Sequence, residues 1–145
     1  MLEKKNNEFA RVNIRYDGKV HKCFLGPRAR LRYENEVRVL EYLSIKNCSF
    51  VPKLIVKDDK NLKVITSNCG HKVENISSEK FHLLFAELET FGVRHNDQSI
   101  RNITYSPKLG RFCLIDFEFA SILEKGYEKG LEPYFDPDLS NGDFN

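Results

Sequence analysis

The stretch "HNDQSIRN", residues 95–102, decides the fold of this chain when it is combined with "LIDFEFA", residues 114–120. The first stretch places a carboxylate, Asp97, two residues after a histidine and five residues before a carboxamide, Asn102. The second stretch places an acid, Asp116, inside an apolar run. A buried acid is costly unless it is paired or binds a metal. The pattern therefore predicts a site in which Asp116 has a cation as its partner.

The composition is typical of one globular domain. With 145 residues and 41% hydrophobic content, the chain can build one core but not two. No apolar run approaches the roughly 20 residues that span a bilayer, and residues 1–10 lack the apolar stretch of a secretory signal. The four cysteines are scattered without a Cys-x-x-Cys pair, which indicates reduced thiols rather than a zinc site. We therefore expect a cytoplasmic protein with no membrane segment.

The net charge is +2, but the charges are unevenly spread. Residues 1–60 carry 14 Lys and Arg against 8 Asp and Glu, so the remainder of the chain is acidic. A first half that meets phosphates and a second half that holds metal would produce this asymmetry, and so would an ordinary solvated surface. Aromatic and basic residues do not alternate as they do in binders of single-stranded nucleic acid, so we do not expect a nucleic acid as a partner.

Period-2 alternation predicts two strands near the N-terminus. In "FARVNIRY", residues 9–16, apolar and polar side chains alternate, and Asp17-Gly18 is a strong hairpin turn. The return strand, "KVHKCFL", puts Lys22 on the same face as Val20 and Phe24. A lysine on an apolar face is costly unless it has a partner of opposite charge.

The next segment has the period of a helix. It runs from Leu31 to about Leu43, and Val39, Leu40 and Leu43 follow Glu36 at three, four and seven residues. Glu36 therefore shares the apolar stripe of this helix.

The remaining elements alternate between strands and one helix. "VPKLIV" (51–56) and "NLKVIT" (61–66) are predicted to be two short strands. Ser77 or Ser78 caps an amphipathic helix, and Gly92 ends it. Two further strands, "ITY" and "RFCLIDF", follow the polar loop. This order predicts an α+β fold with an antiparallel sheet.

With these elements in place, the two opening stretches resemble the active-site motifs of protein kinases. "HNDQSIRN" is similar to the kinase catalytic loop, and "IDFE" is similar to the metal-binding Asp-Phe-Gly segment with Glu in place of Gly. The resemblance is to the compact atypical kinases and the kinase-like small-molecule phosphotransferases. It implies a single minimal protein-kinase-like domain with a small antiparallel sheet lobe (1–67), a reduced helical lobe (68–120) and an acidic tail (121–145).

The resemblance implies a role for each polar residue of the two motifs. Asp97 would be the catalytic base that takes the proton of the acceptor hydroxyl. Asn102 would act with it and, together with Asp116, would hold Mg²⁺ beside ATP. Without the resemblance, Asp97 could simply cap a turn, and Asp116 could accept backbone amides.

The resemblance extends to an ion pair in the first half of the chain. Lys22 resembles the catalytic strand lysine that holds the α- and β-phosphates, and Glu36 resembles the helix glutamate that pairs with it. Two charges on buried faces can offset each other when they are paired. The alternative is a snorkelling Lys22 and a solvated Glu36. If the register is shifted, Lys19 and Glu34 would take the two roles.

Other parts of the kinase pattern are placed by order or are missing. The hinge that would hold adenine falls at Thr66, Ser67 and Asn68. No Gly-x-Gly-x-x-Gly precedes Lys22, so the phosphate-covering loop is absent or reduced to "YDGK". Near the first helix the chain carries arginines that either clamp phosphate from the side or are solvated charges. These are Arg28, Arg30 and Arg32.

The predicted function is an ATP- and Mg²⁺-dependent phosphotransferase. The alternative is a non-catalytic nucleotide-binding pseudokinase or scaffold that needs a partner protein, which the missing glycine loop and the short C-terminal part favour. The phosphate acceptor is left open between a protein and a small molecule. A partner subunit could complete the acceptor surface.

Overall fold

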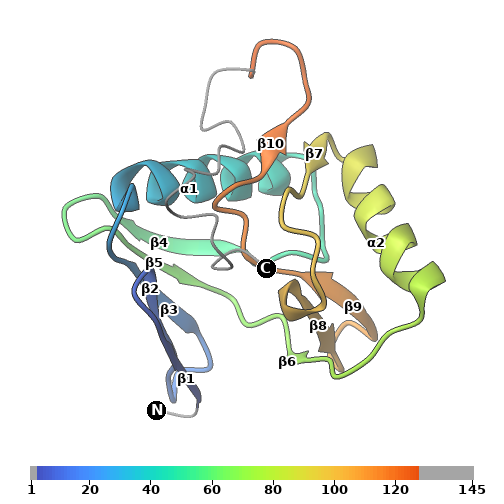
Figure 1. Cartoon of the computed structure of the whole chain (residues 1–145), viewed down its shortest axis with the longest axis horizontal. Coiled ribbons are helices and arrows are strands. Elements are labelled where there is room, and N and C mark those ends of the chain that lie inside the picture. The colour runs from blue at the N-terminus through green and yellow to red at the C-terminus, as the bar shows by residue number, and fades with distance from the viewer. Residues whose placement is uncertain (1–2, 128–145) are drawn as a thin grey trace.

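The computed structural model describes residues 3–127, and its first half is a five-stranded antiparallel sheet with a long helix beside it (Figure 1). The strands lie in the order β1-β2-β3-β5-β4, and every neighbouring pair is antiparallel. The helix α1 spans Ala29–Ile45. The strands are β1 Glu3–Asn6, β2 Ala10–Ile14, β3 Val20–Phe24, β4 Leu54–Asp58 and β5 Lys63–Thr66.

The sheet and α1 bury an apolar layer between them. Phe24 on β3 and Val64 on β5 pack with Tyr33 and Val37 of α1. The rings of Phe24 and Tyr33 meet edge to face, with their centroids 5.7 Å apart. Burial of each large side chain contributes about 1.5–3 kcal/mol. Because Lys22 precedes Phe24 by two residues on the same strand, it enters the layer from the same face.

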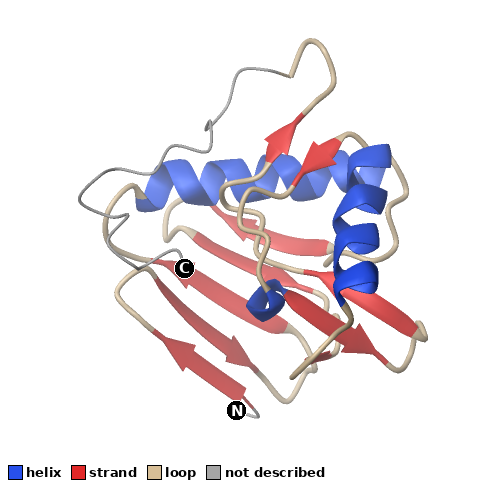
Figure 2. Ribbon diagram, turned by 45° about the vertical axis from the view of Figure 1, so that its right-hand side comes forward, coloured by secondary structure: helices blue, strands red, loops and turns tan. Residues whose placement is uncertain are grey.

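The second half combines α2, which spans Ser78–Thr90, with two small sheets (Figure 2). Ser77 caps α2 by accepting the backbone N–H of Lys80 at 3.2 Å. Side chains of α1, α2 and β9, including the buried Leu43, Leu88 and Leu114, belong to one hydrophobic core, so the two halves share it. The short elements are β6 His71–Lys72, β7 Val93–Arg94, the 3-10 helix η1 Ile100–Asn102, β8 Ile103–Ser106, β9 Arg111–Leu114 and β10 Ser121–Ile122. Their sheets are β6-β8-β9 and β10-β7, both antiparallel.

The mixed α/β class with antiparallel sheets and two helices is confirmed, but four strands were not expected. β1 has the sequence "EKKN", which shows no apolar alternation, and it joins the sheet by pairing with β2 at the edge. β6, β7 and β10 are two residues long, too short to give a periodic signal. β10 lies in the segment expected to be an acidic tail, where Ser121 pairs with Arg94 of β7. The rest of that segment, residues 128–145, lies outside the described residues.

The presence of β1 also decides which turn lies near Lys22. Residues 7–9 connect β1 to β2 without a glycine, and Asn7 Oδ1 accepts the backbone N–H groups of Phe9 and Ala10 at 2.7 and 2.8 Å. "YDGK" forms the β2–β3 turn instead, at the opposite end of β2. Of the two expectations, a covering loop that is absent or one reduced to "YDGK", the position of this turn does not support the second, because none of its residues lines a cavity at Lys22.

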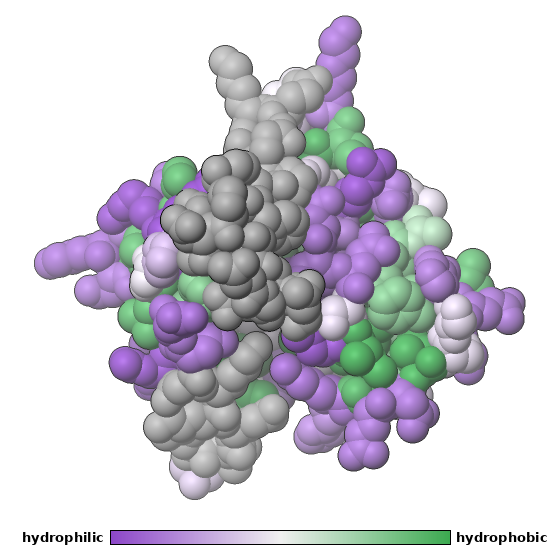
Figure 3. Space-filling model, in the orientation of Figure 1, coloured by the Kyte–Doolittle hydropathy of each residue, from purple (hydrophilic) through white to green (hydrophobic). Residues whose placement is uncertain are grey.

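Figure 3 shows the face of the molecule drawn in Figure 1. Hydrophilic residues cover much of the described surface, and hydrophobic residues gather at the lower right, near the region of β6 and β8. Exposed hydrophobic side chains such as Tyr16, Ile45 and Leu83 come from three separate elements or turns, as is usual for a folded surface. Within residues 3–127, neither helix has the length and apolar character needed to cross a membrane.

Candidate active site

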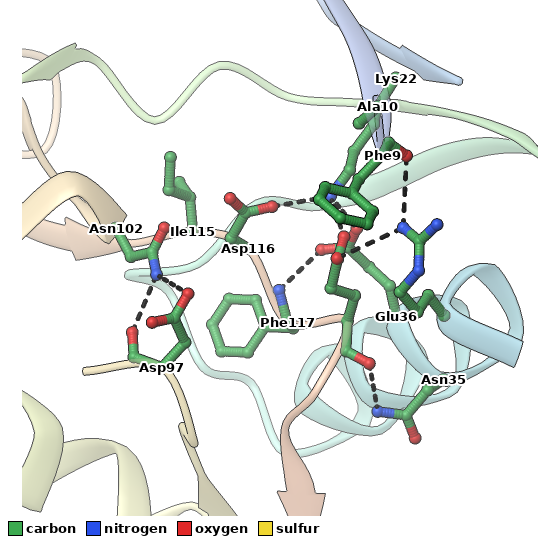
Figure 4. A network of polar contacts seen from close by, with 12 residues as sticks. Phe9, Ala10, Lys22, Asn35, Glu36, Asp97, Asn102, Ile115, Asp116 and Phe117 are labelled. Atoms are coloured by element: carbon green, nitrogen blue, oxygen red, sulfur yellow. Dashed lines mark hydrogen bonds and ion pairs between the residues drawn. The ribbon is translucent and has the colours of Figure 1, made fainter. Parts of the chain in front are cut away.

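Lys22 lies at the centre of a network of carboxylates (Figure 4). Its ammonium nitrogen lies 2.9 Å from Glu36 Oε1 and 2.7 Å from Asp116 Oδ1. A third carboxylate oxygen, Glu118 Oε2, also lies 2.9 Å away. The ammonium group additionally stands 4.6 Å from the centroid of the Phe24 ring. β3, α1 and the loop after β9 therefore meet at one buried cation.

The two glutamates of this network are each held from a second side. Glu36 Oε2 accepts the backbone N–H of Phe117 at 2.8 Å. Glu118 Oε1 lies 3.4 Å from Nη1 of Arg32, whose residue is only 1% exposed. The guanidinium of Arg32 also donates to the carbonyls of Pro27, Phe9 and Leu25. Arg32 is therefore a buried cation that binds other parts of the chain. It is neither the phosphate clamp nor the solvated charge that the sequence led us to expect.

The charges of the network shift the acidity of its members. Burial by itself lowers the pKa of Lys22, but the charges of Asp116, Glu118 and Glu36 outweigh burial and hold this pKa well above its ordinary range. Burial raises the pKa of Glu36, and the charge of Lys22 opposes that rise only in part. Lys22 is therefore protonated at neutral pH, and it is the group that makes the buried carboxylates tolerable.

Asp116 is less buried than we expected from the apolar residues around it in the sequence. β9 ends at Leu114, so Asp116 lies in a loop rather than on the strand. Its φ of 66° is in the left-handed region, which Asp and Asn adopt more readily than most other residues. The side chain is 32% exposed, whereas Phe117 turns into the core. The expectation of a buried acid was wrong because the strand stops before it.

The loop of residues 95–102 holds Asp97 through two donors. Nη2 of Arg101 lies 2.9 Å from both carboxylate oxygens of Asp97. Nδ2 of Asn102 donates to the Asp97 carbonyl at 2.8 Å and to its Oδ2 at 3.1 Å. Because the amide nitrogen is committed to Asp97, the amide oxygen of Asn102 points the other way, toward the side of Asp116 in Figure 4.

His95 links this loop to the segment that carries Asp116. Its Nε2 lies 2.9 Å from the Ile115 carbonyl, and its Nδ1 accepts the backbone N–H of Asp97 at 3.1 Å. A single neutral tautomer, with the proton on Nε2, satisfies both bonds. Burial lowers the pKa of His95, which also favours the neutral ring. His95 is therefore placed to fix the backbone rather than to exchange protons with a substrate.

Two cavities meet at Lys22 and Asp116. The larger one has a volume of about 330 Å³ and lies between the sheet and residues 66–70. The smaller one, of about 80 Å³, lies between the β1–β2 turn and Asp97 and Arg101 of the loop 95–102. Lys22 and Asp116 line both cavities. The larger volume is at the lower end of the range for small-molecule sites.

The expected hinge residues all line the larger cavity: Thr66, Ser67 and Asn68. The backbone N–H of Ser67 already donates to the Lys53 carbonyl at 2.9 Å. Asn68 Oδ1 accepts the backbone N–H of Gly70 at 2.9 Å, which shapes the turn that follows. Of these three residues, Ser67 therefore does not offer its N–H to a ligand.

The remaining expected residues lie outside the cavities. Lys19 and Glu34 are exposed, so the shifted register is not adopted. Arg30 is exposed and donates to the Asp59 carbonyl at 3.3 Å. Arg28 precedes α1 with a φ of 57°. None of these four side chains lines either cavity.

The sequence patterns gave no role to Glu118 or Arg101 and did not indicate that Arg32 is buried. Glu118 stands where the kinase segment has glycine, and that substitution was a visible signal. Arg101 follows Asp97 by four residues, a spacing at which opposite charges often meet. Arg32 gave no local signal, because its partner Glu118 lies 86 residues away.

The donors near Asp116 fit a hard divalent cation. Carboxylate and amide oxygens are ligands that Mg²⁺ accepts, and Asp116 and Asn102 supply one of each. Oxygens of Glu36, Asp116 and Glu118 also lie within 4.8 Å of one another. However, Lys22 is bonded to all three of those carboxylates. Glu36 and Glu118 are also held by the N–H of Phe117 and by Arg32, so Asp116 with Asn102 is the better donor pair.

Comparison with known proteins places the fold but not the function. No family model and no curated protein matches the sequence. Among 160 matching chains of solved structures is the co-crystal structure of WbdD and the kinase inhibitor LY294002, with a TM-score of 0.61 and 19% identity. The match covers 86% of this chain and 33% of that chain, so this chain spans about a third of its neighbour's length. The likeness shows a shared fold and supports the kinase-like architecture.

Proposed function

We propose that this chain is an ATP- and Mg²⁺-dependent phosphotransferase with a minimal kinase-like fold. The observation that carries the proposal is the junction of the two cavities at Lys22 and Asp116, with Asp97 on the wall of the smaller one. A nucleotide in the larger cavity would direct its phosphates at Lys22, and an acceptor hydroxyl in the smaller cavity would face Asp97. Phosphoryl transfer depends mainly on such positioning and on charge placement.

The residues at the junction, and Asn102 behind it, have distinct roles in this proposal. Lys22 binds a phosphate oxygen, and Glu36 orients Lys22. Asp97 accepts the proton of the acceptor hydroxyl at a carboxylate oxygen. Asp116 and Asn102 would hold Mg²⁺, which would neutralise phosphate charge.

Two further groups complete the arrangement. Arg101 keeps the carboxylate of Asp97 in one orientation through its contacts with both oxygens. Residues 66–68 supply the wall against which the adenine packs. WbdD has been crystallised with a kinase inhibitor, and its likeness to this chain supports a nucleotide in a cavity of this kind.

A second candidate function is nucleotide binding without turnover, as in a pseudokinase or scaffold. It is favoured by the β1–β2 turn, where Asn7 Oδ1 occupies the N–H groups of Phe9 and Ala10. In a glycine-rich loop such amides would face the phosphates. The missing donors would slow transfer more than they would weaken binding, because charge develops during the reaction.

Phosphate transfer from γ-labelled ATP distinguishes the two functions. Asp116→Asn is the suitable change, because Asn tolerates the left-handed backbone at this position while being a poorer ligand for a hard cation. It is expected to lose both Mg²⁺-dependent thermal stabilisation by ATP and transfer. Asp97→Asn should keep the stabilisation and lose transfer to an acceptor or to water.

Asp17→Asn provides the matched control, since Asp17 is exposed in the β2–β3 turn and an Asn-Gly pair suits that turn. A wild-type protein that binds Mg·ATP without transfer would favour the second function. If neither Asp97→Asn nor Asp116→Asn changes binding or transfer, the proposed site is wrong.

A further inference from the structure

Lys22 has no donor left for a phosphate in the arrangement described here. An ammonium group carries three N–H donors, and three carboxylates lie within 2.9 Å of Lys22 Nζ. These are the carboxylates of Glu36, Asp116 and Glu118. A phosphate oxygen can therefore bind Lys22 only if one of the three releases it.

Asp116 is the partner that can be released most easily. Its side chain is 32% exposed, compared with 6% for Glu36 and 15% for Glu118. It also lines both cavities, where a metal ion could compete for its oxygens. When Asp116 turns to a cation, one N–H donor of Lys22 becomes available to the nucleotide.

Glu118 cannot be released in the same way. Its second oxygen faces Arg32, which is buried, so its departure would leave two buried cations short of a partner. Its backbone is also held, because Nδ2 of Asn35 on α1 donates to the carbonyls of Glu118 and Ala120 at 3.0 and 2.9 Å. Glu118 therefore keeps its place relative to α1.

We propose that Glu118 is a positioning residue that, together with Glu36, holds Lys22 toward the nucleotide phosphates while Asp116 binds metal. This inference rests on the proposed function. A glycine at position 118 has no carboxylate to contact Lys22. With Glu118 in place, Lys22 has two fixed glutamate partners, Glu36 from α1 and Glu118 from the loop that carries Asp116. The ammonium then keeps its direction when its third carboxylate leaves.

The rival role for Glu118 is a direct metal ligand, and nucleotide titrations with and without Mg²⁺ separate the two roles. The probe is a non-hydrolysable ATP analogue, titrated calorimetrically in EDTA and in excess Mg²⁺. For Glu118→Gln, Kd is expected to rise about tenfold in both conditions, the factor associated with losing one charge-assisted hydrogen bond. The ratio of the two Kd values should stay that of the wild type.

The direction in which Kd changes separates loss of a charge from loss of a positioning contact. Removal of a negative charge near an anionic ligand would by itself tighten binding, whereas loss of a positioning contact weakens it. Asp116→Asn should therefore bind the analogue in EDTA as tightly as the wild type or more tightly, because it frees a donor of Lys22. Glu118→Gln should bind more weakly in the same buffer. Glu34→Gln, an exposed change on α1, is the matched control and should leave Kd unchanged.

The outcomes are distinguishable. An unchanged or lower Kd for Glu118→Gln overturns the inference and leaves the proposed function intact. A rise confined to Mg²⁺ makes Glu118 a metal ligand and also overturns it. A wild type that binds no nucleotide overturns the proposed function and this inference together. If Glu118→Gln does not fold, Glu118→Asp, which keeps the charge on a shorter side chain, is tested for the same rise in EDTA.

Discussion

Replacement of Lys22 by methionine should destabilise the fold as well as impair nucleotide binding. The sequence alone indicated one acidic partner for Lys22, which is Glu36. The structure adds Asp116 and Glu118 to the same ammonium group. The wild-type network sets two cations, Lys22 and Arg32, against three carboxylates, so its net charge is −1. Lys22→Met makes the net charge of the network −2.

The expected loss can be estimated from the burial of the network. Breaking a buried ion pair by removing one partner typically costs about 3–5 kcal/mol. Both Lys22 and Glu36 are buried, and in the variant the donor that Glu36 keeps among residues 3–127 is the N–H of Phe117. The free energy of unfolding of an ordinary domain is about 5–15 kcal/mol. A loss of this size is therefore a large fraction of the total stability.

The loss should grow as the pH rises. Burial already raises the pKa of Glu36, and removal of Lys22 raises that pKa further. An acid whose pKa is higher in the folded state than in the unfolded state, about 4.3, destabilises the fold increasingly as the pH rises above the unfolded value. Lys22 itself stays protonated up to and beyond about pH 10, so its contribution in the wild type is constant between pH 5 and 8.

Urea unfolding followed by circular dichroism at pH 5 and pH 8 measures this difference. Lys22→Met should lose about 3–5 kcal/mol at pH 8 and clearly less at pH 5. Lys19→Met, in an exposed turn, should lose almost nothing at either pH. A loss below about 1 kcal/mol at pH 8, or an equal loss at both pH values, would falsify the view that Lys22 neutralises a buried acidic cluster.

Three further predictions concern the space beside a glycine, the buried ring of His95 and the carboxylate of Asp97. Gly70→Ala should lower the melting temperature far more than Gly110→Ala. Both residues have positive φ, but a Cβ at Gly70 would lie 1.9 Å from the backbone oxygen of Tyr105, whereas a Cβ at Gly110 would meet nothing within 4 Å. Similar losses in melting temperature for the two variants would contradict this. The stability of the wild type should fall as the pH drops below about 6.5, since burial lowers the pKa of His95 and protonation then favours the unfolded chain. His95→Gln should remove part of that fall in a melting series from pH 7 to pH 5, and an unaltered pH dependence would show that another group is responsible. Arg101→Gln should reduce phosphate transfer roughly tenfold or more by loosening Asp97 while leaving the Kd for nucleotide unchanged; weaker nucleotide binding would place Arg101 in the nucleotide site instead.

The sequence by itself determined the elements whose apolar residues repeat with a clear period. The stripe of α1, the hairpin β2–β3 and the hairpin β8–β9 all follow from spacings within one segment. The same reasoning singled out Glu36, because an acid inside an apolar stripe needs a partner, and Lys22 lies 2.9 Å from it. Such signals are visible because neighbours in the sequence share a face.

Only the tertiary structure decided which charges meet and how the site is closed. Lys22 is separated from Asp116 by 94 residues and from Glu118 by 96, and no periodicity relates such positions. Strand β1 was hidden for a similar reason, since its sequence "EKKN" has no apolar alternation and its pairing with β2 depends on the backbone of another segment. The exposure of Asp116 also depended on where β9 ends. Local patterns report which way a side chain faces, whereas its partner is set by the packing that brings distant segments together.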